Sequence, residues 1–152
     1  MHLAKGPCKR SELIPSLRHG SRMAVGSRKG PVPSTCISAS CSSGNVNIYD
    51  YGGGTSWSLV GNTIENTGGH RLDEFGNSVS LSSDGSRVAV GIPRKSRSST
   101  SSDPPGAAKV YELSGSSWTQ MGSDINGEFN ADDFGRVWRA ETHSGTPFTF
   151  TP

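Results

Sequence analysis

Carboxylates are the side chains with the clearest capacity for chemistry in this 152-residue chain. Two pairs of adjacent acids occur, Asp73 with Glu74 and Asp132 with Asp133. Paired carboxylates can act as general acid and general base. Both pairs, however, directly precede a Phe-Gly dipeptide, so they occupy the same position of a duplicated segment. A feature that recurs in each copy is better explained as a turn or loop anchor, and we assign these acids no catalytic role.

Nucleophilic catalysis has little support in the sequence. Serine is abundant, and His70 lies close to Asp73 along the chain. A serine hydrolase would need a strained G-x-S-x-G turn to expose its nucleophile, and the sequence contains none. It also contains no Walker loop, no dinucleotide-binding fingerprint and no H-E-x-x-H motif. We therefore predict that the chain is not an enzyme.

One segment has the composition of a metal-binding loop. Asp124, Asn126 and Gly127 form a D-x-N-G element, but no Glu stands at the twelfth position that a calcium loop requires. Ile125 within it is better explained as a core residue. We predict no metal site at this segment.

The three cysteines, Cys8, Cys36 and Cys41, include no C-x-x-C pair, so they indicate neither a disulfide framework nor a zinc site. We expect free thiols. A bridge between Cys36 and Cys41 in an oxidising compartment is the alternative, and spacing alone does not decide between the two.

Short strands would position the polar residues. Residues 78–82 alternate serine with apolar side chains, and residues 87–90 place Val88 and Val90 on one face, a period of two that predicts strands. Between them, Asp84 and Gly85 supply the positive φ of a tight hairpin. Pro93 ends the second strand because it has no N–H to donate. Residues 75–93 are therefore predicted to form one β-hairpin.

Pieces of this hairpin and its flanks recur about sixty residues away, always in the same order. Residues 21–26 match 86–91, and residues 48–50 match 110–112. A fixed order with small drifts in spacing is typical of a repeat whose loops vary in length. The residues to which we assign structural roles in the repeat are Trp57, Phe75, Gly76, Asp84, Gly85, Gly91, Pro93, Trp118, Phe134 and Gly135.

Each repeat would hold four short strands joined by turns. This predicts an all-β fold, with four-stranded antiparallel blades of a partial β-propeller, about two blades in all. Trp57 and Trp118, one in each fourth strand, are interpreted as packing residues between blades, with ligand stacking as the alternative. We divide the chain into a basic, disordered arm (1–13), a first repeat (14–76), a second repeat (77–135) and an irregular tail (136–152).

The dipeptide of Phe75 and Gly76, followed by a G-I-P tripeptide at 91–93, resembles the FG-GAP motif of integrin-α-type β-propellers. The resemblance covers about residues 14–135. It implies an extracellular setting if the chain belongs to a longer parent. In that family the hairpin often holds calcium through a D-x-[DN]-x-D-G loop. Here the loop has one carboxylate, Asp84, too few for the six to eight oxygens that calcium takes, so we expect no cofactor.

Composition and charge narrow the function classes further. The net charge of +2 requires no polyanionic partner, although the basic residues of 1–30 leave nucleic-acid binding as a minor alternative. No apolar run approaches the roughly 20 residues of a membrane helix, and no apolar segment marks a signal peptide. The localisation is left open.

We predict a non-catalytic interaction module that binds protein or glycan partners through blade loops. The alternative is an accessory repeat region of a larger extracellular hydrolase. Two blades would leave sheet edges and apolar faces uncovered, which favours association. We therefore also expect further blades of the same array, or self-association, as partners.

Overall fold

The computed structural model describes residues 21–28, 44–67, 69, 73–95, 105–129, 134–136, 139–141 and 149–151. These residues form strands and turns and no helix, which confirms the all-β prediction. With no helix among them, none of the described residues forms one that could cross a membrane. The arm of residues 1–13, the cysteines, His70 and the pair Asp132 and Asp133 lie outside the described residues.

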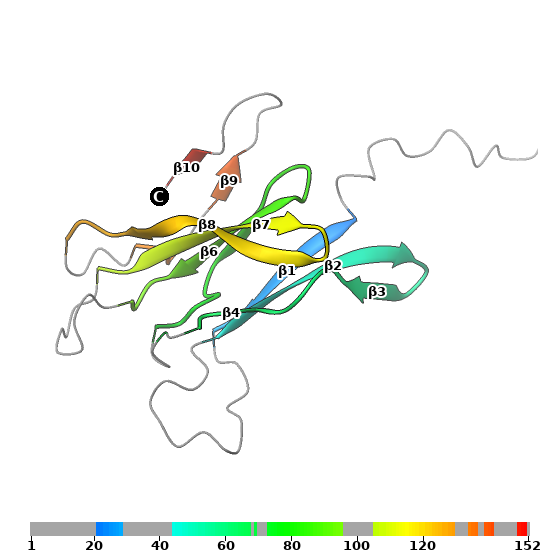
Figure 1. Cartoon of the computed structure of the whole chain (residues 1–152), viewed down its shortest axis with the longest axis horizontal. Helices are drawn as coiled ribbons and strands as arrows, with labels where there is room; N and C mark the ends of the chain where they lie inside the picture. Colours follow the sequence, from blue (N-terminus) through cyan, green and yellow to red (C-terminus); the bar gives the residue numbers. More distant parts are fainter. Residues whose placement is uncertain are drawn as a thin grey trace, which may run out of the picture.

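The first sheet is antiparallel and centres on β2 (Asn45–Gly53). One side of β2 pairs with β1 (Arg22–Ser27). The other side pairs first with β3 (Ser56–Leu59) and then with the short β4 (Ile64–Glu65), as Figure 1 shows. β3 and β4 together therefore run along a single edge of β2.

The second sheet is an antiparallel meander of four strands. Its order is β5 (Val79–Leu81), β6 (Arg87–Ile92), β7 (Ala107–Ser114) and β8 (Ser117–Asn126). The predicted hairpin at residues 75–93 is present as β5 and β6, with Val79 opposite Val90. Within the tail expected to be irregular, β9 (Arg139–Glu141) pairs with β10 (Thr149–Thr151).

The two sheets pair their strands at matched positions of the duplicated segments. Arg22 lies opposite Asp50 in the first sheet, and Arg87 lies opposite Glu112 in the second. In each case an ion pair joins the two side chains, at 2.6 Å and 3.1 Å respectively. Equivalent cross-strand pairs with opposite charges stabilise both sheets in the same way.

One hydrophobic core fills the space between the sheets. The buried residues of this core are Val46, Ile48, Ile64, Phe75, Val88, Val90, Ile92, Ala107, Tyr111 and Trp118. Strand alternation assigns the strand residues among them to one face of each sheet, because paired residues share a face. Phe75 packs edge-on against Tyr111, with ring centroids 6.3 Å apart and planes at 89°. Burial raises the pKa of Tyr111 to about 12.

The Phe-Gly turn joins the two sheets through the backbone. Gly76 has a φ of 82°, and its N–H donates to the Gly91 carbonyl at 3.1 Å. The carbonyl oxygen of Gly76 would lie 2.1 Å from a Cβ built on Gly26 of β1. In the same way, the carbonyl oxygen of Gly135 in the second Phe-Gly dipeptide would lie 2.0 Å from a Cβ on Gly91 of β6. Both contacts leave space for hydrogen alone, so glycine is required at these two strand positions.

Candidate functional site

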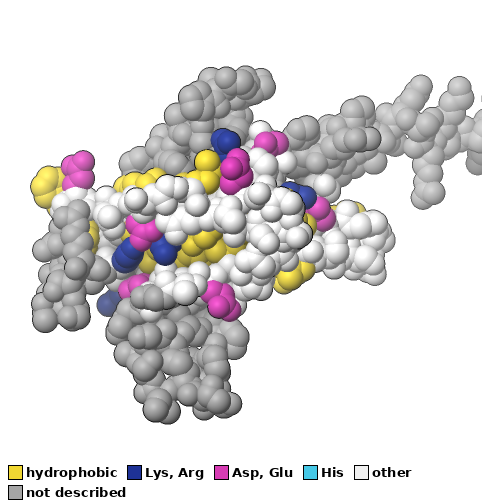
Figure 2. All heavy atoms as spheres, viewed as in Figure 1, with side chains coloured by type: hydrophobic (Ala, Val, Ile, Leu, Met, Phe, Trp, Pro, Cys, Tyr) yellow, Lys and Arg dark blue, Asp and Glu magenta, His cyan; other side chains and the backbone are white. Residues whose placement is uncertain are grey.

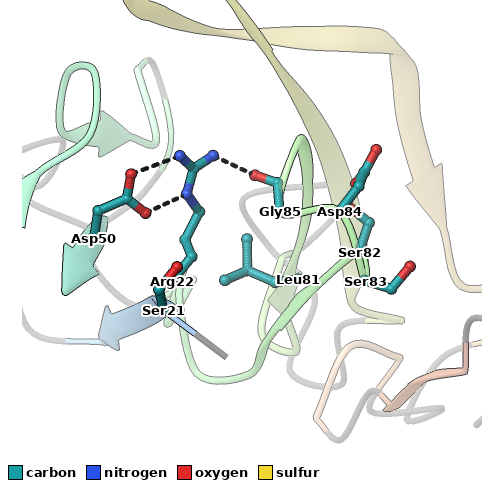
Figure 3. Close-up of a pocket in the computed structure, with 8 residues that line it drawn as sticks. All are labelled: Ser21, Arg22, Asp50, Leu81, Ser82, Ser83, Asp84 and Gly85. Atoms are coloured by element: carbon teal, nitrogen blue, oxygen red, sulfur yellow. Dashed lines mark hydrogen bonds and ion pairs between the residues drawn. The ribbon is translucent and has the colours of Figure 1, made fainter. Parts of the chain in front are cut away.

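A polar cleft lies where the β5–β6 hairpin meets the first sheet. Its volume is about 270 Å³. One wall comes from Ser21, Arg22 and Asp50, and the other from hairpin residues 81–85. Figure 3 shows the Arg22 side chain reaching between the two walls, with Leu81 beside it. The cleft is therefore built jointly by both sheets.

Arg22 links the two walls of the cleft. Its Nε and Nη2 donate to the two carboxylate oxygens of Asp50 at 2.6 Å and 2.7 Å, and its Nη1 donates to the Gly85 carbonyl at 2.8 Å. Bidentate pairs of this kind are strong and geometrically specific. The hydrogen bond with Asp50 raises the pKa of Arg22, and the same bond lowers the pKa of Asp50. Arg22 thus holds the hairpin at a fixed distance from β1.

Asp84 at the hairpin tip is held by its neighbours. Its carboxylate accepts hydrogen bonds from Ser82 Oγ at 2.5 Å, Ser86 N at 3.0 Å and Ser86 Oγ at 2.8 Å. These bonds favour the charged form and lower the pKa of Asp84 to about 2, with the Ser82 bond the largest cause. Gly85 follows with a φ of 69°, as a tight hairpin requires.

The cleft offers hydrogen-bonding groups from side chains and backbone. The guanidinium of Arg22 is neutralised by Asp50, so the cleft does not present a bare positive charge. None of the described residues that line it is a histidine, and the Asp84 carboxylate that accepts from Ser82 has a pKa of about 2, which makes it a weak base for activating that hydroxyl. Ser83 lies exposed in the cleft wall. Such a surface suits hydroxyl or amide groups of a ligand.

A second polar cluster joins the sheets at their opposite end. Lys109 Nζ donates to Asn66 Oδ1 at 3.0 Å, and Asn66 Nδ2 donates to Asp73 Oδ2 at 3.2 Å. Asp124 pairs with Lys95 and lies 3.8 Å from Lys109 Nζ. Burial is the main cause of a lowered pKa for both lysines. Asn66 and Asp73 are buried, so the cluster has little room for a ligand.

The metal-like segment at 124–127 takes part in this cluster. Asp124 accepts from Gln120 Nε2 at 2.8 Å as well as pairing with lysine. Ile125 is exposed, contrary to its interpretation as a core residue. In the part of the chain that the structure describes, no three or more His, Cys, Asp or Glu side chains are placed to hold a metal ion.

The two tryptophans of the repeat, Trp57 and Trp118, have different surroundings. Trp118 is 5% exposed, and its Nε1 donates to the Val60 carbonyl of the first sheet at 2.9 Å. Its backbone N–H donates to Asn62 Oδ1 at 2.8 Å. Trp57 is 48% exposed and contacts Tyr51, with ring centroids 5.1 Å apart. Trp118 therefore packs between the sheets, whereas Trp57 lies on an outer face.

The remaining sequence-selected residues lie at the sheet junctions and not in the cleft. The turn of Phe75 and Gly76 contacts Gly26 of β1 and Gly91 of β6. Pro93 is buried just after β6. Phe134 forms a parallel bridge with Gly106, and Gly135 accepts a hydrogen bond from Ser78 Oγ at 2.7 Å. Of the selected residues, only Asp84 and Gly85 line the cleft.

Sequence reasoning missed the roles of Arg22 and Asp50. Both stand in segments that match the second copy, and their counterparts Arg87 and Glu112 are also oppositely charged. The recurrence of an oppositely charged pair in both copies was the sequence feature that could have predicted the pairing of Arg22 with Asp50. The bond from Arg22 to Gly85 had no such indication, because it joins different sheets.

The pKa of Asp84 leads to a pH prediction. Because its pKa is lowered from 3.8 to about 2, Asp84 stabilises the fold above pH 4, and this contribution is lost as the pH falls toward 2. We expect Asp84→Asn to be less stable than wild type at neutral pH and equally stable near pH 2. Denaturant midpoints measured across this range test it, with Glu128→Gln at an exposed, distant acid as control. A constant gap between wild type and Asp84→Asn would contradict the prediction.

No protein-family model matches the sequence, and no curated protein matches it.

Proposed function

We propose that this chain is a non-catalytic binding module of β-propeller type, which recognises a polar group of a protein or glycan partner in the cleft between the two sheets. The observation that carries this proposal is the cleft itself. It is open and lined by hydroxyl and backbone groups, its Arg22 is paired with Asp50, and its Asp84 carboxylate accepts hydrogen bonds from Ser82 and Ser86. Sites with a few fixed polar groups orient ligands by hydrogen bonds.

Two further observations support the propeller part of the proposal. The strands of the two sheets pair at matched positions, and each Phe-Gly turn contacts a glycine of the preceding sheet in the same way. Loops held by such a rigid scaffold commonly carry binding functions. The Arg22 bridge from β1 to the Gly85 carbonyl gives the cleft a defined width before any ligand arrives.

The proposal is tested by screening the chain on glycan and peptide arrays and measuring the affinity of any hit by calorimetry. Ser83→Tyr places a large side chain in the cleft, and we expect it to weaken binding by about tenfold or more, equivalent to roughly 1.4 kcal/mol. The matched control is Thr67→Tyr, an exposed position just after β4, outside the cleft. Equal affinities for the two variants, or no hit on either array, would contradict a binding role for the cleft.

A further inference from the structure

The interface between the two sheets provides a template for a second interface of the same kind. In it, one face of the second sheet packs on one face of the first. The second sheet contributes Val88, Val90, Tyr111 and Trp118, and the first sheet contributes Val46, Ile48 and Ile64. Each sheet therefore has one face inside this interface and one face turned outward.

The outward face of the first sheet matches the inward face of the second, position by position. Met23 and Val25 stand where Val88 and Val90 stand, and Trp57 stands where Trp118 stands. Tyr51 lies opposite Trp57, as Leu113 lies opposite Trp118. The large apolar residues exposed on this outward face are Met23, Val25, Tyr51, Trp57 and Leu59. A soluble chain rarely leaves so many neighbouring apolar side chains open to water without a partner.

The outward face of the second sheet matches the inward face of the first. Met121 and Ile125 of β8 are exposed there, and Figure 2 shows hydrophobic side chains at the surface along β8. Gly135 already covers the Gly91 side of this face. The side formed by β7 and β8 is the part that remains for a partner.

The packing of Trp118 in the inner interface indicates which side chain would fit on this second face. In the inner interface, Trp118 donates to the Val60 carbonyl and its ring lies against Gly61, where a Cβ would come within 2.9 Å of Cδ1. In the repeat, Val60 and Gly61 of the first copy correspond to Met121 and Gly122 of the second. Gly61 and Gly122 have similar φ values of 73° and 64°. A Cβ on Gly122, however, would have nothing within 4 Å. The position over Gly122 that matches the one the Trp118 indole occupies over Gly61 is therefore open, and we call it the socket.

We propose that copies of this chain associate head to tail, with the outward face of the first sheet of one copy packed on the outward face of the second sheet of the next. Trp57 of one copy lies over Gly122 of the other and donates to its Met121 carbonyl. The occupant is a second copy because the chain itself carries both halves of an interface that it already forms internally. Such a contact is heterologous, so it extends into a ring or a filament and is not limited to a symmetric dimer. This association does not depend on ligand binding in the cleft.

Two variants each disrupt one of the two faces that form the proposed contact. Trp57→Asp removes the indole, and Gly122→Asn fills the socket with a residue that tolerates a left-handed backbone. Both positions are exposed, so each variant is expected to keep its fold, which its melting temperature checks. If either variant unfolds, Leu59→Asp and Met121→Glu replace them on the same two faces.

Sedimentation over a range of concentrations gives the result. The mass of wild type is expected to rise with concentration, and each variant alone is expected to associate at least about tenfold more weakly. An equimolar mixture of the two variants is expected to form a dimer, because one copy retains the intact tryptophan and the other the intact socket. A wild type that stays monomeric, a Gly122→Asn variant that associates like wild type, or a mixture that stays monomeric would each overturn the proposal.

Discussion

Trp118→Ala is expected to lower the free energy of unfolding by about 3–5 kcal/mol, whereas Trp57→Ala is expected to cost less than about 1 kcal/mol. The two residues occupy matched positions of the two sheets, but Trp118 is 5% exposed and Trp57 is 48% exposed. Removing the Trp118 indole opens a cavity between the sheets and leaves the Val60 carbonyl without its donor. Removing the Trp57 indole opens no such cavity.

Chemical denaturation followed by circular dichroism measures both losses. The lowest workable protein concentration keeps association from contributing to the apparent stability. Because a domain of this size is stable by only about 5–15 kcal/mol, Trp118→Ala is expected to shift the denaturation midpoint strongly. Similar losses for the two variants would show that the sheets do not pack through Trp118.

The second large effect concerns the glycines at the sheet junctions. Gly26→Ala and Gly91→Ala are each expected to cost about 3 kcal/mol, at the upper end of overpacking effects. A Cβ at Gly26 would meet the Gly76 carbonyl oxygen at 2.1 Å, and one at Gly91 would meet the Gly135 carbonyl oxygen at 2.0 Å. These neighbours are backbone atoms, so relief requires the Phe-Gly turn to move away from the sheet. For Gly26→Ala, such a movement would strain the hydrogen bond from Gly76 N–H to the Gly91 carbonyl. For Gly91→Ala, it would strain the bond from Ser78 Oγ to the Gly135 carbonyl.

Gly52→Ala is the matched control for these variants. Gly52 also lies in a strand, but the nearest atom to its Cβ position is the Ser56 carbonyl oxygen at 3.8 Å, an ordinary contact. Alanine there is expected to be neutral or stabilising by a few tenths of a kcal/mol, because it restricts the unfolded chain. The melting temperature is expected to fall by roughly 6–12 °C for Gly26→Ala and Gly91→Ala. A drop at Gly52→Ala of similar size would mean that the effect is a general cost of alanine and not of the junction.

The hairpin was predictable from the sequence because its determinants are local. The alternating side chains in 78–82 and 87–90 predict β5 and β6. The dipeptide of Asp84 and Gly85 predicts the turn between them. The same local rules predict the strands at 109–113 and 117–121, which lie within β7 and β8. Strand register follows from these patterns, since a slip of one residue would move the valines to the wrong face.

The contacts between sheets were not predictable by the same rules. Lys109 meets Asn66 and Arg22 meets the Gly85 carbonyl across many intervening residues, and neither pair has a local pattern. Ile125 is interpreted from the sequence as a core residue, as is consistent with its counterpart Ile64 in the first repeat, which is buried, yet Ile125 itself is exposed. Matched sequence positions have different burial because a second sheet covers only one of them. Burial of a repeated residue thus depends on its neighbours in space, which a single copy of the pattern does not encode.

The backbone junction has a consequence for how this architecture tolerates change. Gly26 and Gly44 stand at the two ends of the segment that joins β1 to β2, and both lie against the turn of Phe75 and Gly76. The turn therefore contacts both ends of that segment, and its closest approaches there are to main-chain atoms. We expect changes of length between residues 29 and 43 to leave these contacts in place, so the distance between the sheets would not depend on how long that stretch is.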